Sequence, residues 1–173
     1  MLMILQFKKS FSYILICSII GLALITVSEN AQGATNRPLP RFVSLGASII
    51  HLRTGPGKRY PIDWVYTKSN LPAKIVAEHK KWRKVIMQDG TSGWVFSKLL
   101  SNKRTVIIKN SEGRIYQKPK TNSKVSAVVE YGVIASLDKC NQSWCKVKLE
   151  SHKLTGWIQQ NMLWGILPNE FHD

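Results

Sequence analysis

Short stretches of alternating apolar and polar residues recur from about residue 49 to residue 158. The stretch Trp82–Met87 is typical: alternation places Trp82 and Lys84 on one face of a strand and Arg83 and Val85 on the other. After residue 33 no stretch has the 3.6-residue apolar period of an amphipathic helix. The pattern therefore predicts an all-β fold made of many short strands.

The expected strands fall into two groups separated by the short segment 101–104. In the first group, the Asp89-Gly90 pair is a strong hairpin signal between two strands. Many short strands favour small barrels, closed or partly open, because a barrel leaves few free edges. The expected strands are Ile49–Leu52, Ile62–Tyr66, Leu71–Glu78, Trp82–Met87 and Gly93–Phe96, then Thr105–Lys109, Arg114–Gln117, Val125–Val129, Val133–Leu137, Trp144–Leu149 and Leu154–Ile158.

The two groups are copies of one another, because anchor residues recur at an offset of 62 or 63 positions. The anchors are Pro56 with Pro119, Trp82 with Trp144, and Gly93 with Gly156. We expect a first unit at 42–100 and a second at 105–164, preceded by a mobile segment at 34–41 and followed by a tail at 165–173. A four-residue linker keeps the two units close together or at a fixed angle.

The N-terminal segment has the three parts of a secretory signal. Lys8 and Lys9 precede the uncharged run Phe11–Val27, and Ala31-Gln32-Gly33 supplies small residues for cleavage after Gly33. An uncleaved anchor is the alternative, although a spanning helix needs about 20 apolar residues. The segment predicts an exported protein of the periplasm or cell envelope, without a transmembrane span after cleavage.

The chain is strongly basic, with a formal net charge of +15. Removal of the N-terminal segment would take away two lysines and one glutamate and leave +14. Such an excess favours acidic partners such as cell-wall carboxylates, phosphorylated lipid heads, glycosaminoglycans or nucleic acid. Export disfavours nucleic acid, and a solvated basic surface without a dedicated ligand is the alternative.

Cys140 and Cys145 are the two thiols that follow the N-terminal segment. In an oxidising compartment an even number of cysteines indicates a disulfide, here one that ties a hairpin. A metal pair would need nearby histidines or more cysteines, and a redox motif has two intervening residues, not four. Trp144 is adjacent to Cys145 and could cover such a bridge.

The first unit resembles the bacterial SH3-like (SH3b) domain family. The resemblance is carried by Leu52-Arg53-Thr54-Gly55-Pro56-Gly57, Tyr60-Pro61, Trp82-Arg83-Lys84-Val85, Gly93-Trp94-Val95 and Leu99-Leu100. The second unit resembles a degenerate copy that lacks the Arg-Thr-Gly-Pro-Gly loop but keeps Trp144, Val147, Gly156, Trp157 and Leu163. The whole layout is similar to small tandem-repeat envelope proteins of alphaproteobacteria. The resemblance implies two small β-barrels that bind peptidoglycan or its peptides.

Aromatic rings interleaved with cations suit an extended, carboxylate-bearing peptide. The candidate ligand-binding residues of the first unit are Arg53, Tyr60, Trp64, Trp82 and Trp94. Arg53 could instead brace its own loop, and Trp94, which follows Gly93, could instead be a core residue. The second unit would brace or orient the first.

The sequence offers little for catalysis or cofactors. Its carboxylates are dispersed, its histidines lack metal-ligand spacing, and no glycine-rich phosphate loop is present. We therefore expect a non-catalytic binding module for peptidoglycan or envelope peptides. One alternative is a scaffold for another envelope protein. Another is a polyanion-binding or adhesin-like surface factor, with Lys80, Lys81, Arg83, Lys84, Lys118, Lys120 and Lys124 as its charges.

Overall fold

The computed structural model describes residues 35–141, 143–168 and 170. The expected export signal and its cleavage site lie outside the described residues. Among the residues that are described, no helix has the length and apolar character that crossing a membrane requires.

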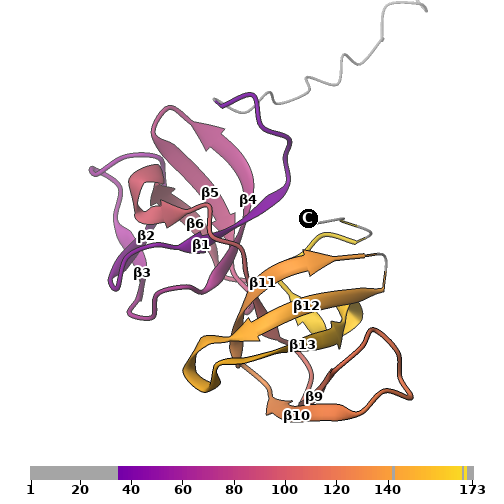
Figure 1. Ribbon diagram of the computed structural model, residues 1–173. Helices are drawn as coiled ribbons and strands as arrows, with labels where there is room; N and C mark the ends of the chain where they lie inside the picture. The colour runs from indigo at the N-terminus through magenta and orange to yellow at the C-terminus, as the bar shows by residue number, and fades with distance from the viewer. Residues whose placement is uncertain (1–34, 142, 169, 171–173) are drawn as a thin grey trace, which may run out of the picture. The chain divides into compact units, whose positions relative to one another are not determined.

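The first domain is a seven-stranded antiparallel sheet with the strand order β3-β2-β6-β5-β4-β1-β7 (Figure 1). A short 3-10 helix covers Ser97–Leu99. The five strands expected here are all present, with bounds that differ by at most two residues. The strands are β1 (Arg41–Leu45), β2 (Ile50–Arg53), β3 (Ile62–Tyr66), β4 (Pro72–His79), β5 (Trp82–Ile86), β6 (Ser92–Phe96) and β7 (Leu100–Ser101).

The second domain repeats this topology strand for strand, in the order β10-β9-β13-β12-β11-β8-β14 (Figure 1). Each strand takes the place of the first-domain strand numbered seven lower, so the sequence repeat is a structural repeat. The strands are β8 (Thr105–Ile108), β9 (Glu112–Tyr116), β10 (Val125–Glu130), β11 (Ile134–Cys140), β12 (Trp144–Leu149), β13 (Leu154–Gln159) and β14 (Leu163–Trp164).

Strand β1 was not expected from the sequence, because it does not alternate. Four of its five residues are buried, including the polar Ser44. Strand β8, its counterpart, is buried throughout and contains Thr105. The Ser44 Oγ and Thr105 Oγ1 atoms lie 2.6 Å apart, and the Thr105 hydroxyl donates to the Asn70 carbonyl at 2.7 Å. These bonds satisfy hydroxyl groups that burial would otherwise leave unpaired.

The repeated glycines Gly93 and Gly156 have the same packing role in the two domains. A Cβ atom at Gly93 would lie 2.6 Å from Leu52 Cγ and 2.9 Å from the Arg53 carbonyl oxygen. A Cβ atom at Gly156 would lie 2.4 Å from Ile115 Cγ2. Any side chain here would push neighbouring strands apart, which explains why both anchors are glycine.

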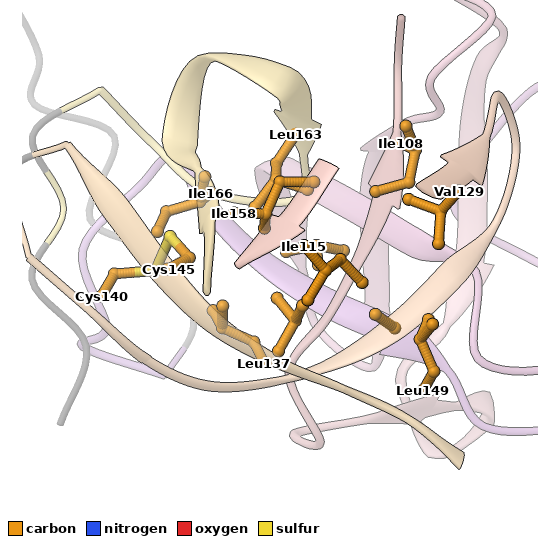
Figure 2. Packing of buried hydrophobic residues seen from close by; sticks show 13 residues of the cluster. Ile108, Ile115, Val129, Leu137, Cys140, Cys145, Leu149, Ile158, Leu163 and Ile166 are labelled. Carbon is orange, nitrogen blue, oxygen red and sulfur yellow. A yellow bond between two sulfur atoms is a disulfide. The ribbon is translucent and has the colours of Figure 1, made fainter. Parts of the chain in front are cut away.

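The predicted disulfide between Cys140 and Cys145 is present and belongs to the core of the second domain. Figure 2 shows it among the buried aliphatic side chains of that core, which also includes Ile166. Trp144 does not cover the bridge. Neighbouring residues of β12 face opposite sides of the sheet, so Trp144 lies outside and packs edge-on against Tyr116, with 5.4 Å between the ring centroids.

A buried ion network lies on the first domain, where β1, β4 and β5 meet. The Glu78 carboxylate, whose side chain is fully buried, pairs with Arg41 and with Arg83 Nε at 3.0 Å. It also accepts a hydrogen bond from the Thr35 backbone N–H at 2.9 Å. Burial acts to raise the pKa of Glu78, but hydrogen bonds from Arg41 and Thr35 and the two positive charges outweigh it, so the pKa is lowered. Arg83 is therefore part of the interior and not of the basic surface.

The edge strands β3 and β10 expose apolar side chains at equivalent positions. Ile62 and Val65 of β3 correspond to Val125 and Val128 of β10, at the repeat offset of 63. Their exposed fractions range from 39% to 57%. An exposed apolar edge strand is a surface on which other chains can pair.

Candidate binding faces

The outer face of the first sheet brings cations and aromatic rings together in one cross-strand row. The register pairs Lys84 of β5 with Trp94 of β6, and Trp94 with Arg53 of β2. The next pair along these strands is Trp82 with Phe96, whose ring centroids lie 5.6 Å apart. We call these five residues the first-domain face. Paired residues of adjacent strands point to the same side of the sheet, so the set forms one surface.

Trp94 belongs to this face and not to the core. Its neighbours Gly93 and Val95 are buried, whereas Trp94 is half-buried with its ring on the outer side. Lys84, beside it, is exposed. The indole is therefore partly packed and partly exposed to solvent.

Arg53 braces its own loop and also borders the face. Its Nη1 donates to the Tyr60 carbonyl at 2.7 Å and to the Lys58 carbonyl at 3.1 Å. These bonds fix a half-exposed guanidinium next to Trp94. The brace holds the positive charge in place, which reduces the ordering cost of binding an anion there.

The other two predicted site residues have different surroundings. The Tyr60 ring fills the space above Gly55, where a Cβ atom would lie 2.3 Å from the ring, and the Arg59 guanidinium lies 5.1 Å from the ring centroid. Trp64 is 54% exposed and pairs with the buried Leu52, on the side of the hairpin opposite Arg53. The structure thus brings together Arg53, Trp82 and Trp94 but places Trp64 apart from them.

The second domain has an equivalent row with different chemistry. The register pairs Lys146 with Trp157 and Trp157 with Tyr116, and Trp144 packs against the Tyr116 ring. Gln159 pairs with Trp144 and takes the position that Phe96 has in the first domain. We call these five residues the second-domain face. Tyr116 stands where the first domain has Arg53, so an aromatic ring replaces a cation.

The sequence did not mark Tyr116, Trp157 or Gln159 as candidate site residues, because the second unit lacks the Arg-Thr-Gly-Pro-Gly loop of the first. The repeat offset alone could have found them, since it maps Arg53 to Tyr116 and Trp94 to Trp157. Over the parts of the chain that the structure describes, no group of three or more His, Cys, Asp or Glu residues is placed to hold a metal ion.

The strand order and the paired outer faces define a tandem of small SH3-like β-barrels. The family described as the bacterial SH3 domain matches residues 47–102 and 109–165, which together make up more than half of the chain. The chain therefore belongs to the bacterial SH3 domain family, and the family matches each of the two domains separately.

Among curated proteins, the chain is similar to YrvJ of Bacillus subtilis (strain 168), which is named as an N-acetylmuramoyl-L-alanine amidase. The two are 23% identical over 162 residues, covering 87% of this chain but 30% of the relative. The chain thus spans less than a third of the curated relative that it matches.

Among solved structures, NlpC1 from Trichomonas vaginalis matches 73% of this chain and 46% of its own, at 11% identity and a TM-score of 0.34. An NlpC/P60 family protein from Bacillus cereus ATCC 10987 matches 71% of this chain and 55% of its own, at 15% identity and a TM-score of 0.32. At these scores the structural matches add nothing to the family assignment.

Proposed function

We propose that the protein is a non-catalytic binding protein of the cell envelope, and that its first domain binds a carboxylate-bearing peptide of peptidoglycan or of another envelope component. The observation that carries the proposal is the first-domain face, in which Trp94 lies between Arg53 and Lys84 in one cross-strand row. No cofactor is needed for this role.

The face suits such a ligand for two physical reasons. Flat, half-packed rings offer contact area at a small entropy cost, and Trp82 is held by its edge-on contact with Phe96. Arg53 and Lys84 flank the central indole, so a peptide lying on the ring would place carboxylates within reach of either cation. The family match and the name of the Bacillus subtilis relative support peptidoglycan as the source of the peptide.

Export to the periplasm or cell envelope is part of the same proposal. The three-part N-terminal segment and the internal disulfide both suit an oxidising compartment outside the cytoplasm. Peptidoglycan is reached only from that side of the membrane.

The test is cosedimentation of the protein, from Ala34 onward, with purified peptidoglycan sacculi at low and at high salt. We expect retention at both salt concentrations, because a shaped aromatic face depends less on salt than dispersed charge does. The variants Lys84→Ala and Trp94→Ala should reduce the bound fraction. Lys98→Ala and Trp64→Ala remove the same residue types from exposed positions outside the face, so they should bind as the wild type does.

Other outcomes would replace the proposal. Equal loss of binding in Lys84→Ala and Lys98→Ala, together with release at high salt, would indicate attraction of a polyanion to the whole basic surface. That surface would include the exposed Lys80, Lys81 and Lys118 but not the buried Arg83. Absence of binding at both salt concentrations would favour a scaffold for another envelope protein.

A further inference from the structure

A cavity of about 470 Å³ lies on the second domain, beside the second-domain face. Ser143, Gln159, Gln160 and Asn161 line it with polar groups, and Leu163 and Ile166 form part of its apolar lining. A smaller cavity of about 150 Å³ is lined by Tyr116, Gln159 and Met162, together with Glu112 and Arg114. Gln159 borders both cavities, Tyr116 borders the smaller one, and the Trp144 ring packs against Tyr116.

The polar lining both donates and accepts hydrogen bonds. Each side-chain amide of Gln159, Gln160 and Asn161 has two N–H donors and a carbonyl acceptor, and the Ser143 hydroxyl can do either. The complementary ligand groups are hydroxyls and amides, which also donate and accept. A carboxylate only accepts and would leave the amide carbonyls unpaired.

The charged residues that line these cavities are two cations and one carboxylate, of which one cation is paired. Arg114 Nε lies 3.2 Å from Glu112 Oε1. Lys109 contributes one cation to the larger cavity. Cations also lie beside the Trp157 indole: Lys146 pairs with it across the strands and is 3.2 Å from Asp138 Oδ2, and Lys139 Nζ lies 5.9 Å from the ring centroid. The difference from the first-domain face is at the other neighbour of the indole, where Tyr116 stands in place of Arg53.

Side chains, not backbone, must recognise a ligand here. Strand β9 pairs with β10 and β13, and β12 pairs with β11 and β13, so the strands that carry Tyr116 and Trp144 are interior strands of the sheet. An extended peptide could not add to the sheet at this position. A sugar ring, in contrast, presents an apolar face to an aromatic ring and hydroxyls at its rim.

We infer that the second domain has its own site for an uncharged, N-acetylated oligosaccharide. The rings of Tyr116, Trp144 and Trp157 provide the apolar contact. Gln159 and the amides beside it bond the hydroxyl and acetamido groups. The second domain is thus a ligand-binding domain with a specificity different from that of the first.

The experiment titrates a tetramer of N-acetylglucosamine into the protein from Ala34 onward, followed by isothermal calorimetry and by the side-chain amide and indole signals in NMR spectra. The matched probe is a glucose tetramer, which lacks the acetamido groups. We expect the acetylated tetramer to bind more tightly and to shift the Gln159, Trp144 and Trp157 signals. Because the ligand is uncharged, its affinity should change little with salt.

Variants separate this site from the rest of the chain. Gln159→Ala should weaken binding about tenfold, because it leaves ligand groups without partners. Gln117→Ala removes an exposed amide elsewhere in the same domain and should have no effect. Trp144→Ala should abolish binding, whereas Trp82→Ala, its counterpart in the first domain, should not.

The inference is wrong if the acetylated tetramer does not bind, or if Gln159→Ala and Gln117→Ala bind it equally well. It is also wrong if Trp82→Ala loses sugar binding while Trp144→Ala retains it. The proposed function is tested separately by Lys84→Ala and Trp94→Ala against sacculi, so either proposal can fail while the other stands.

Discussion

Replacing Glu78 with glutamine removes the negative charge that Arg41 and Arg83 share in the interior of the first domain. The exposed fractions of the three side chains are 0% for Glu78, 17% for Arg41 and 8% for Arg83. Removing one partner of a buried ion pair costs roughly 3–5 kcal/mol, because the remaining charge is left uncompensated.

The structure favours the lower end of that range. Arg83 keeps hydrogen bonds from Nη1 to the Lys80 and Trp82 carbonyls, both at 2.9 Å. Arg41 is more vulnerable, because its buried Nε and Nη1 have no hydrogen-bond partner among the described residues. We therefore expect a loss of about 3 kcal/mol in the free energy of unfolding of the first domain. For a domain of this size that corresponds to a melting temperature lower by roughly 12–24 °C.

Differential scanning calorimetry of the wild type and of Glu78→Gln measures this change in the first-domain transition. The control is Glu112→Gln, which breaks an exposed pair with Arg114 in the second domain and should cost less than about 1 kcal/mol. If the two variants lower their transitions equally, the Glu78 network contributes no more than a surface pair and the reasoning is refuted.

The remaining predictions concern pH, the disulfide and the buried glycines. The pKa of Glu78 is below its ordinary value of 4.5. The contribution of this carboxylate to the free energy of unfolding is therefore complete above pH 4.5 and is lost as the pH falls through the lowered pKa. The stability difference between wild type and Glu78→Gln should therefore shrink on acidification, and calorimetry at a series of pH values checks this. Replacing Cys140 and Cys145 with serine should cost the second domain about 2 kcal/mol and leave the first-domain transition unchanged, as denaturant unfolding would show. Gly156→Ala should destabilise its domain by about 1–3 kcal/mol, because the new Cβ meets neighbouring atoms at 2.4 and 2.8 Å. The control in the same denaturant assay is Gly57→Ala, because its Cβ would lie 3.4 Å or more from its neighbours. We expect this variant to change the free energy of unfolding little.

Much of the fold could be predicted because most strands have one face in the core and one in water. Strand β5 is an example: Arg83 and Val85 are buried while Trp82 and Lys84 face outward, as alternation indicates. The repeat supported these predictions further, because a strand in one unit predicts a strand at the same offset in the other.

Strand β1 could not be predicted in this way. Its sequence Arg-Phe-Val-Ser-Leu is buried on both faces, so no alternation marks it. The hydroxyl of Ser44 is accommodated there only because Thr105 and the Lys103 carbonyl, about sixty residues away, supply partners. A local pattern contains no information about such distant partners.

The sequence predicted which residue types form the candidate site, but it did not predict which of them share a face of the sheet. Arg53, Trp82 and Trp94 lie on one face because their strands are neighbours in the sheet. Trp64 lies elsewhere because the β2–β3 register shifts by one residue between Leu52 and Arg53. Each such shift moves a side chain to the opposite face, and spacing along the sequence does not reveal it.

The exposed apolar edges of β3 and β10 have a consequence for how the protein behaves in concentrated solution. At low ionic strength a net charge of +15 keeps molecules apart and prevents these edges from meeting. At about 1 M salt the screening length falls to about 3 Å, and that repulsion no longer protects Ile62, Val65 and their counterparts in β10. We expect self-association through edge pairing to compete with ligand binding under these conditions. Chains that sediment with one another would then resemble chains retained by the cell wall. Light scattering of the protein alone at each salt concentration separates colloidal association from wall binding.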